Sequence, residues 1–368
     1  MRVLFSGGGT AGHITPALAI SEILEEEFQN YTKAFVGRAG GAENLAIENL
    51  GHTLFTLDLI GLRRSISTKN IQAIYKLIRS MKDAKKIIDD FSPDLIIGTG
   101  GYVCYPIIKT GLKKNIPCLI HEANAYPGLV TRIIGHKCDK VMLGMEDAEK
   151  HLPKCNNISY AGNPIRRDFQ TTDKRTARKK LNIKESETLI VSFGGSLGSE
   201  IINNVIIDFI KEYSIKVQGI RHIHACGKKH FDEIRKKEPE LCDKSKKCQI
   251  VPYIDNMPTL LSASDISITR SGAMTIAELM SVNCFPILIP SPNVTANHQF
   301  YNAKAFSEKG RATLIEEKEL SLDKLRDTVI SIINNKSKKQ QKELNFLHED
   351  KRCKKAILEI IKTTLKDK

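Results

Sequence analysis

Two short glycine-rich segments carry the residues of this chain whose types and spacing best suit phosphate binding. They read GGGTAGH (residues 7–13) and GGSLG (residues 194–198). Each follows an apolar run typical of a strand and precedes a helical pattern, so each predicts a strand–turn–helix unit. Glycines let a phosphate approach the backbone closely, and the unpaired N–H groups at the start of a helix point toward it. The repeated pattern therefore predicts two phosphate-bearing ligands, one for each half of the chain.

A dinucleotide site is an alternative interpretation of the first segment. Gly7, Gly9 and Gly12 satisfy the GxGxxG spacing of dinucleotide-binding folds. Such a site for NAD would place an acidic residue at the end of the next strand, where this chain has Arg38. An NADP-binding oxidoreductase stays possible on that ground. It leaves the second segment unexplained, because Ser196 stands there in place of a glycine.

Short apolar runs alternate with helical patterns along both halves of the chain. Strands are expected at residues 2–8, 33–37, 93–101, 116–122, 188–195, 221–227, 248–254, 265–272 and 284–292. Helices are expected at residues 16–28, 41–51, 199–213 and 273–282. This alternation predicts an α/β protein of two Rossmann-like parallel-sheet domains that face each other across a cleft.

The turn-rich segment AGNPIRRDF (residues 161–169) marks the expected join between the domains. We place an N-terminal domain at residues 1–162 and a C-terminal domain at residues 163–340. A lysine-rich helical tail follows at residues 341–368. This tail either stays solvated or packs back on the first domain.

Composition narrows the functional class. The chain has 368 residues, 41% of them hydrophobic, and a net charge of +14. No apolar run approaches the ~18 residues needed to span a membrane, and no signal peptide is visible, so we expect a cytoplasmic protein. The charge alone would suit a nucleic-acid-binding protein. The chain has no Trp, no RRM-like aromatic motif and no zinc-finger spacing, and we expect no nucleic-acid partner.

Metal binding is not expected either. The nine cysteines are scattered and form no CxxC pair. His222 and His224 would share one face of a strand, which suits either a metal pair or simple packing within the sheet. Packing is the preferred interpretation, because no third ligand lies nearby in the sequence.

Polar residues gather where several expected strands end. His121, Glu122 and Asn124 follow one strand, Glu278 lies in the helix after another, and Gln299 follows a third. Open α/β sheets bind their ligands beyond the carboxyl ends of the strands. These segments are therefore candidates for a shared site.

At this level of detail the chain resembles the bacterial peptidoglycan glycosyltransferases of the MurG type, which belong to the GT-B class and to glycosyltransferase family 28. The resemblance covers residues 3 to about 312. It rests on motifs that occur in the family's order: GGGTAGHITPALAI, GTGGYVCYP, HEANAYPGL, GNPIR, GGSLGSEIIN, YIDNMPTLLSASDISITRSGAMTIAEL and NHQFYNAKAFSEKGRA.

The resemblance implies an inverting transfer of N-acetylglucosamine from UDP-N-acetylglucosamine. The acceptor would be the 4-hydroxyl of the muramyl sugar in undecaprenyl-diphosphate-linked N-acetylmuramyl-pentapeptide, a step of peptidoglycan synthesis. Both substrates contain a diphosphate, which would account for the two glycine segments. The family implies no cofactor and no metal. Another GT-B enzyme that uses UDP-sugars, a glycolipid synthase or an epimerase, is the alternative.

The resemblance also implies roles for individual residues. His13 would be the general base or would orient the acceptor, because an imidazole titrates near neutral pH. Glu122 is the rival base, and a histidine that only fixes its loop is the structural alternative for His13. The implied substrate-binding residues are Thr10, Ala11, Gly12, Asn124, Arg166, Ser196, Ile254, Ala273, Met274, Thr275, Glu278, His298 and Gln299.

Among these residues, Ser196 and Arg166 would meet the diphosphate and Glu278 the ribose. Ile254 would offer its backbone to uracil, and Gln299 with His298 would contact the sugar hydroxyls. Ala11, Ala123 and Leu197 replace residues that are usual in the family. We expect these replacements to change affinity rather than the reaction.

A basic amphipathic stretch offers a use for the net charge. Residues 61–88 interleave apolar side chains with Arg63, Arg64, Lys69, Lys76, Arg79 and Lys82. This pattern is typical of a helix that lies on an anionic membrane surface, and a solvated helix packed on its own domain is the alternative. A lipid-linked acceptor favours peripheral contact with the cytoplasmic face of the cell membrane, where other cell-wall synthesis proteins are further possible partners.

Overall fold

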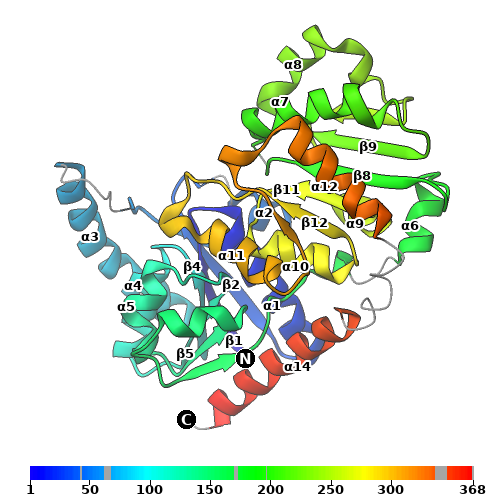
Figure 1. Ribbon diagram of the computed structural model, residues 1–368. Coiled ribbons are helices and arrows are strands. Elements are labelled where there is room, and N and C mark those ends of the chain that lie inside the picture. The colour runs from blue at the N-terminus through cyan, green and yellow to red at the C-terminus, as the bar shows by residue number, and fades with distance from the viewer. Residues whose placement is uncertain (42–43, 62–67, 170–172, 196, 336–345, 367–368) are drawn as a thin grey trace. The chain divides into compact units, whose positions relative to one another are not determined.

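The computed structural model describes residues 1–41, 44–61, 68–169, 173–195, 197–335 and 346–366 of the chain. It forms two compact units, each with its own sheet (Figure 1). Unit 1 comprises Met1–Arg166 together with Asp350–Lys368, and unit 2 comprises Arg167–Glu349. The chain passes from unit 1 to unit 2 four residues after the boundary that we predict, and its last residues return to unit 1.

Unit 1 contains a seven-stranded parallel sheet in the order β3-β2-β1-β4-β5-β6-β7. Its strands are β1 (Arg2–Gly7), β2 (Thr32–Arg38), β3 (Leu54–Leu57), β4 (Leu95–Gly100), β5 (Cys118–Glu122), β6 (Lys140–Leu143) and β7 (Ile158–Tyr160). The strand order reverses direction at β1, so the carboxyl ends of β1 and β4 flank the switch point of this sheet. Ligands of doubly wound sheets bind at such a point.

Helices cover both faces of this sheet. They are α1 (Ala11–Glu27), α2 (Asn44–Asn49), α3 (Thr68–Phe91), α4 (Cys104–Lys113), α5 (Leu129–Ile134) and α14 (Phe346–Lys366). Side chains alternate along a strand, and β1 shows the result. Val3 and Phe5 pack in the core beneath α1 and α14, whereas Leu4 packs in the core beneath α3 and α4.

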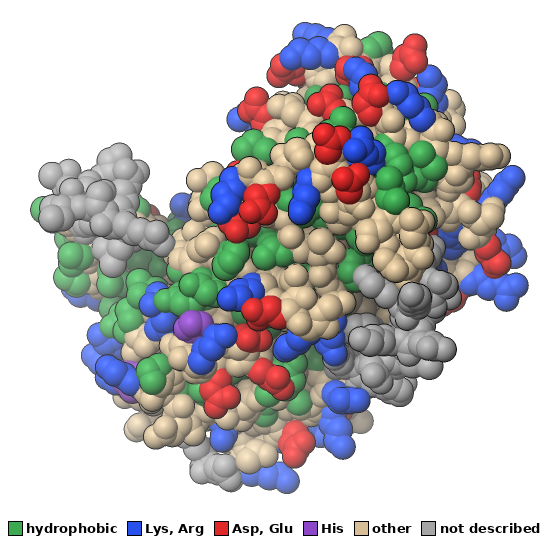
Figure 2. Space-filling view, viewed as in Figure 1, with side chains coloured by type: hydrophobic (Ala, Val, Ile, Leu, Met, Phe, Trp, Pro, Cys, Tyr) green, Lys and Arg blue, Asp and Glu red, His purple; other side chains and the backbone are tan. Residues whose placement is uncertain are grey.

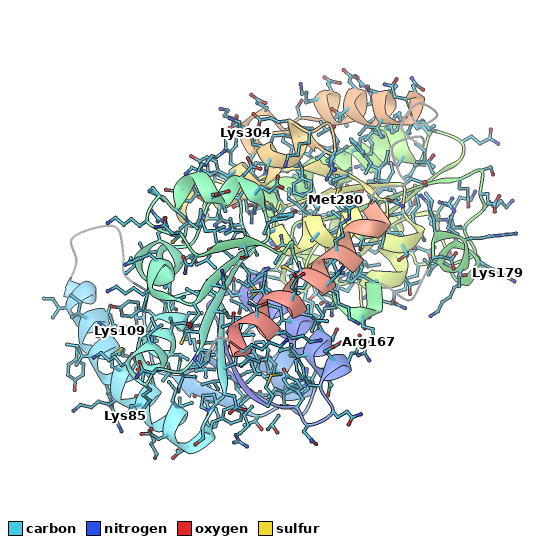
Figure 3. The ribbon with its side chains drawn as sticks, turned by 90° about the horizontal axis from the view of Figure 1, so that it is seen from below. Lys85, Lys109, Arg167, Lys179, Met280 and Lys304 are labelled. Atoms are coloured by element: carbon cyan, nitrogen blue, oxygen red, sulfur yellow. The ribbon has the colours of Figure 1, made fainter. Side chains whose placement is uncertain are left out.

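The C-terminal helix α14 packs on unit 1. Its buried Cys353, Ile357 and Ile361 share a core with residues of α1. Figures 1 and 3 both draw α14 alongside α1. Two ion pairs, Lys354 with Glu26 and Lys362 with Glu27, flank this contact. The spacing of the three buried residues gives α14 one apolar face, and that face is covered rather than solvated.

Unit 2 contains a six-stranded parallel sheet in the order β10-β9-β8-β11-β12-β13. Its strands are β8 (Thr188–Phe193), β9 (Ile220–Ala225), β10 (Cys248–Val251), β11 (Ile266–Thr269), β12 (Phe285–Leu288) and β13 (Thr313–Leu314). Its helices are α6 (Lys174–Lys180), α7 (Glu200–Phe209), α8 (Lys228–Lys237), α9 (Met257–Ala263), α10 (Ala273–Ser281), α11 (His298–Ser307) and α12 (Leu322–Asn334). The switch point of this sheet lies between β8 and β11.

Short segments of other helix types complete the two units. The 3₁₀ turns are η1 (Gly135–Lys137), η2 (Glu146–His151), η3 (Arg167–Phe169), η5 (Pro239–Cys242), η6 (Thr295–Asn297) and η7 (Glu317–Glu319). The π-helical turn η4 (Ile210–Ser214) continues α7 without a break. No helix of the described residues is long and apolar enough to cross a bilayer.

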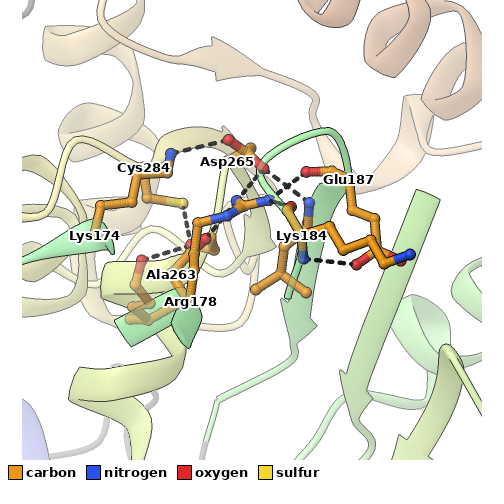
Figure 4. A network of polar contacts seen from close by, with 10 residues as sticks. Lys174, Arg178, Lys184, Glu187, Ala263, Asp265 and Cys284 are labelled. Atoms are coloured by element: carbon orange, nitrogen blue, oxygen red, sulfur yellow. Dashed lines mark hydrogen bonds and ion pairs between the residues drawn. The ribbon is translucent and has the colours of Figure 1, made fainter. Parts of the chain in front are cut away.

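A buried ion-pair network ties α6 to the sheet of unit 2 (Figure 4). The Asp265 carboxylate, just before β11, accepts hydrogen bonds from Arg178 Nη1 at 3.0 Å, Lys174 Nζ at 2.9 Å and Leu189 N at 2.8 Å. Arg178 also donates to the carbonyl oxygens of Ala263, Lys184 and Glu187. The side chains of Asp265 and Arg178 are almost completely buried, so each charge depends on these partners.

The predicted alternation of strands and helices is confirmed, and all the predicted strands are present. Four strands that the sequence did not reveal are β3, β6, β7 and β13, each of two to four residues. The shortest two, β7 and β13, carry too few positions to show a period. The end of α7 also differs from the expected regular helix, because the chain widens there into the π-helical turn η4.

Candidate functional site

The first glycine segment lies at the switch point of unit 1, between the end of β1 and the start of α1. A second glycine turn, Gly100-Gly101, follows the neighbouring strand β4. Gly8 N donates to the carbonyl oxygen of Gly100 at 3.4 Å. Gly101 has a φ of 80°, and a Cβ on it would collide with the carbonyl oxygen of Gly8. The two turns are thus in direct backbone contact, which only glycine permits at residue 101.

His13 occupies the first turn of α1, next to this contact. Its Nδ1 lies 2.9 Å from the carbonyl oxygen of Gly8 and 3.2 Å from Thr10 Oγ1. A carbonyl oxygen only accepts, so Nδ1 carries the hydrogen and Nε2 of the neutral ring carries the lone pair. A Cβ on Gly100 would lie 3.1 Å from Nε2. The ring is therefore oriented by the two glycine turns in the tautomer that a general base needs.

Tyr102 is a further candidate for the site at the first glycine segment, and the sequence patterns did not point to it. A Cβ added to Gly9 would lie 3.6 Å from Tyr102 Cε1, and one added to Gly61 would lie 3.2 Å from the same atom. The half-buried phenol ring thus borders the first glycine segment. Its signal in the sequence was an aromatic residue directly after the glycine pair at the end of an expected strand.

Glu122, the rival base, is enclosed by its own loop. Its side chain is buried, and Oε1 accepts from Asn124 N at 3.2 Å and from Asn124 Nδ2 at 3.1 Å. Oε2 accepts from Gly128 N at 2.8 Å and from Thr131 Oγ1 at 2.7 Å. Hydrogen bonds from four donors to one carboxylate fix the chain from residue 122 to α5. This geometry suits a residue that orders the loop carrying Asn124.

His121 precedes Glu122 and points to the opposite face of β5. Its Nε2 lies 2.9 Å from the carbonyl oxygen of Gly162, and the side chain is completely buried. Burial lowers the pKa of His121, so the ring is neutral and donates to Gly162. We therefore assign His121 a packing role, in which it joins β5 to the segment that follows β7.

The second glycine segment lies at the switch point of unit 2, between β8 and α7. Ser196, which we expect at the diphosphate, lies outside the described residues. Gly198 has a φ of 78°, and a Cβ on it would collide with the carbonyl oxygen of Cys226 at the end of β9. A Cβ on Gly227 would in turn lie 2.8 Å from Gly198 N. The segment is therefore pressed against the backbone that follows β9.

Arg270 is a second residue that sequence analysis did not find. It follows β11, and its Nη2 donates to Ser199 Oγ at 2.7 Å. Arg270 also pairs with Glu317 at 2.5 Å and donates to the carbonyl oxygen of Ile289 at 3.2 Å. It thus connects Ser199, the residue after the second glycine segment, with the end of β12 and with η7. The residue opens the motif RSGAMTIAE, whose helical part carries the predicted Glu278.

Five predicted residues of unit 2, namely Ala273, Met274, Thr275, Glu278 and Gln299, lie in α10 and in the first turn of α11. Ala273 and Met274 are buried in the first turn of α10, and Thr275 and Glu278 are half-buried one turn apart. Gln299 Oε1 accepts from Ser291 N at 2.9 Å, and its carbonyl oxygen accepts from Ser271 Oγ at 2.8 Å. The bond from Ser271 joins the start of α10 to the start of α11, and the bond from Ser291 ties Gln299 to the loop after β12.

Three further predicted residues are Ile254, Arg166 and His298. Ile254 is nearly buried in the loop between β10 and α9, and Arg166 is the half-buried last residue of the first segment of unit 1. His298 begins α11, and its Nδ1 lies 2.8 Å from the carbonyl oxygen of Thr295. Nothing in the described residues forms a group of three or more His, Cys, Asp or Glu that could hold a metal ion.

The chain matches the glycosyltransferase family 28 N-terminal domain over residues 3–143 and the glycosyltransferase family 28 C-terminal domain over residues 189–357. It is 37% identical to a protein of Acetivibrio thermocellus over 100% of this chain and 99% of that one. It is 40% identical to a protein of Caldanaerobacter subterraneus over 92% of each. Both relatives are named UDP-N-acetylglucosamine–N-acetylmuramyl-(pentapeptide) pyrophosphoryl-undecaprenol N-acetylglucosamine transferase.

Solved structures share the fold. The structure of MurG from Acinetobacter baumannii has a TM-score of 0.71 at 20% identity and covers 99% of each chain. A UDP-GlcNAc 2-epimerase from Neisseria meningitidis, solved with UDP-GlcNAc, has a TM-score of 0.65 at 15% identity and covers 99% of this chain and 100% of that one. At these identities the likeness concerns the architecture of the chains.

Proposed function

The chain belongs to glycosyltransferase family 28, and from this membership we propose that it transfers N-acetylglucosamine from UDP-N-acetylglucosamine to an undecaprenyl-diphosphate-linked N-acetylmuramyl-pentapeptide. A relative with that name aligns over the whole chain. The structural observation that carries the proposal is the glycine segment at the switch point of each sheet. Two such segments suit a reaction in which donor and acceptor each contain a diphosphate. The product would be the disaccharide lipid precursor of peptidoglycan.

We assign the acceptor to unit 1. Thr10, Ala11 and Gly12 would bind its diphosphate at the start of α1, and Asn124 would contact it from the loop that Glu122 orders. His13 is the proposed base. Its lone pair on Nε2 follows from the hydrogen bond between Nδ1 and Gly8, and an imidazole is poised for proton transfer near neutral pH.

We assign the donor to unit 2. The segment around Ser196 would bind the diphosphate, with Arg166 as a further charge partner. Glu278 would accept from the ribose hydroxyls, and the backbone of Ile254 would contact uracil. Gln299 and His298, with Ala273, Met274 and Thr275 at the start of α10, would surround the sugar. No residue of this set requires a metal or a cofactor for its role.

The proposed reaction is one displacement at the anomeric carbon. The 4-hydroxyl oxygen of the muramyl sugar attacks that carbon while His13 Nε2 takes the hydroxyl proton. The bond between the carbon and the UDP oxygen breaks, and UDP leaves with the electron pair. Attack from the side opposite UDP inverts the configuration and gives a β-1,4 link. Helix N-termini and cationic side chains would stabilise the departing diphosphate.

We further propose that α3 lies on an anionic membrane. Ile71, Ile74, Tyr75 and Ile78 form one stripe along α3 and are 52–71% exposed. Exposed Arg79 and Lys82 lie on the same helix. Arg63 and Arg64 of the expected basic stretch lie outside the described residues, as does the side chain of Lys69.

The surroundings of α3 extend this face. Figure 2 shows hydrophobic side chains gathered over α3 and the helices beside it, with basic side chains among them. On α5, Leu129 and Ile133 are also about half exposed. Apolar side chains that enter the bilayer and cations beside them are the two contributions that hold a peripheral helix on anionic lipid. The protein would bind the cytoplasmic face of the cell membrane.

Release of UDP from UDP-N-acetylglucosamine, measured with and without a short-chain lipid-linked muramyl-peptide, tests the proposed reaction. Release that depends on the acceptor, together with a β-1,4-linked disaccharide product, is the expected result. Conversion of the nucleotide sugar without any acceptor would instead favour an epimerase. Binding of the donor with no reaction on this acceptor would favour a glycolipid synthase.

A further inference from the structure

A chain of five buried polar side chains crosses the core of unit 2. It runs from Ser214 in η4 through His222, Ser192 and His224 to Asn203 in α7. All five side chains are at most 2% exposed. Neither the proposed base nor the proposed substrate contacts use any of them. Burying five polar side chains costs folding free energy unless every donor and acceptor has a hydrogen-bond partner. The direction of each hydrogen bond in the array therefore has to be consistent with those of its neighbours.

The direction of each hydrogen bond follows from the last one. Asn203 Nδ2 donates to the carbonyl oxygen of Cys226 at 3.0 Å, so Asn203 Oδ1 must accept from His224 Nε2 at 3.1 Å. His224 Nδ1 of the neutral ring then accepts from Ser192 Oγ at 2.8 Å. The carbonyl oxygen of Ser192 is also 3.2 Å from Nδ1, but a bond to it would require the charged ring.

The rest of the chain follows in the same way. Because the Ser192 hydroxyl donates its one hydrogen to His224, Ser192 Oγ accepts from His222 Nε2 at 2.8 Å. His222 Nδ1 then accepts from Ser214 Oγ at 3.0 Å. Every hydroxyl and every ring nitrogen has a partner when both histidines are neutral. The two histidines that could have formed a metal pair are therefore linked through a serine.

This array of hydrogen-bonded side chains ends beside the second glycine segment. The carbonyl oxygen of Cys226 that accepts from Asn203 is the atom against which Gly198 is pressed. Asn203 lies in the first helical turn of α7, directly after that segment, and Ser192 lies just before it in β8. Members of the array thus lie in the strand before the segment and in the helix after it. Among the residues that the structure describes, His224 links Ser192 to Asn203 through its two ring nitrogens.

We propose that His224 is a positioning residue for the donor, acting through Asn203 to hold Gly198, the last residue of the second glycine segment, against the carbonyl oxygen of Cys226 after β9. This inference rests on the proposed function, in which that segment binds the diphosphate of the UDP-sugar. Backbone N–H groups bind a diphosphate well only if they are held in place before it arrives. Loss of the link between His224 and Asn203 would therefore weaken donor binding, whereas the proton transfer at His13 in unit 1 would be unaffected.

Two substitutions of similar size separate positioning from simple packing. In His224→Gln, the side-chain amide can reach the place of Nε2 and donate to Asn203. In His224→Asn, the shorter amide reaches only the place of Nδ1, so the link to Asn203 is lost. Both variants lose one bond of a buried array, and both should lower the thermal midpoint. Ser214→Ala is the matched control, because it breaks the array at the end remote from the glycine segment.

The experiment measures the dissociation constant of UDP by calorimetry, and kcat and KM for UDP-N-acetylglucosamine, each at a temperature well below the variant's midpoint. His224→Asn is expected to raise both the dissociation constant and KM about tenfold or more with kcat changed less than threefold. His224→Gln and Ser214→Ala should stay within about threefold of the wild type in both constants.

Equal effects of the Asn and Gln substitutions, or unchanged UDP binding in His224→Asn, would overturn the assignment. So would a fall in kcat without a rise in KM. If the wild type binds UDP but forms no disaccharide, the proposed function fails on the acceptor side. The UDP-binding comparison among the variants would still decide the role of His224.

Discussion

His13 Nδ1 lies 2.9 Å from the carbonyl oxygen of Gly8, a residue of the same glycine segment. This hydrogen bond orients the imidazole and selects the tautomer with a lone pair on Nε2. The same contact serves both interpretations of His13, as a base and as a residue that only fixes the loop. The two interpretations differ in which ring nitrogen matters.

Substitutions at His13 separate these interpretations. His13→Ala should lower the acceptor-dependent rate about 10²- to 10⁴-fold, the range for loss of a general base. In His13→Asn the side-chain amide can still donate to Gly8, but no atom replaces Nε2. This variant should be as inactive as His13→Ala while its thermal midpoint stays closer to the wild type. His136→Ala, at an exposed histidine of η1, serves as the control. Substantial activity in His13→Asn would show that the ring only fixes the loop.

Glu122→Gln should damage the loop rather than the chemistry. An amide places an NH₂ group opposite hydrogen-bond donors that now meet a carboxylate oxygen. We expect a loss of about 1–3 kcal/mol in the free energy of unfolding and a higher KM for the acceptor. The pH dependence of kcat should stay as in the wild type. Thr131→Val removes one of the donors and should act in the same direction.

The same measurements on Glu122→Gln would also reveal a catalytic role of Glu122. A fall of kcat by more than a hundredfold in Glu122→Gln, with an unchanged thermal midpoint, would identify Glu122 as the base.

Acid should destabilise unit 2 through its buried histidines. Burial lowers the pKa of His224 to about 4 and the pKa of His222 well below its usual value. Both rings are neutral when folded, whereas the unfolded chain binds protons below about pH 6.5. Stability is thus complete above that pH and falls as the pH drops toward 4. Between pH 6.5 and pH 5 each histidine should remove up to about 2 kcal/mol from the free energy of unfolding.

Urea unfolding at a series of pH values measures this slope. Burial also lowers the pKa of His121 in unit 1, so the wild-type slope contains that residue too. The comparison with His224→Gln isolates one ring, and this variant should show a shallower slope between pH 6.5 and pH 5. Identical slopes for the two proteins would contradict a neutral buried His224.

Asp265→Asn should be severely destabilising. It leaves the buried Arg178 without its ionised partner and weakens the bond to Lys174 (Figure 4). Breaking a buried pair on one side costs about 3–5 kcal/mol. Glu233→Gln, which removes an exposed pair with Lys237, should change the unfolding midpoint little. Equal midpoints for the two variants would mean that the buried network contributes no more than a surface pair.

Membrane binding should depend on the apolar stripe of α3. Replacing both Ile74 and Ile78 by Ser should reduce binding to phosphatidylglycerol vesicles about tenfold or more. The reason is that each substitution removes apolar surface that would be buried in the bilayer. Raised salt should weaken binding of the wild type, since exposed cations contribute. Ile215→Ser, at an exposed isoleucine of unit 2, is the control. If vesicle binding is insensitive to the α3 substitutions, the membrane face lies elsewhere.

Local patterns in the sequence determined much of this protein. The apolar runs predicted the strands of both sheets, and the glycines predicted the two strand–turn–helix segments, because these features depend on residues close together in the chain. The order of motifs indicated the family. The tertiary structure decided which distant residues meet.

Only the fold brings Tyr102 beside Gly9, Arg270 to Ser199, and α14 onto α1. It also turned the apparent pair His222 and His224 into links of a hydrogen-bonded chain with Ser192, Ser214 and Asn203. The reason is physical. A parallel sheet places strands side by side that are tens of residues apart in sequence, and the partners of a buried polar group are chosen by that packing rather than by its neighbours in the chain.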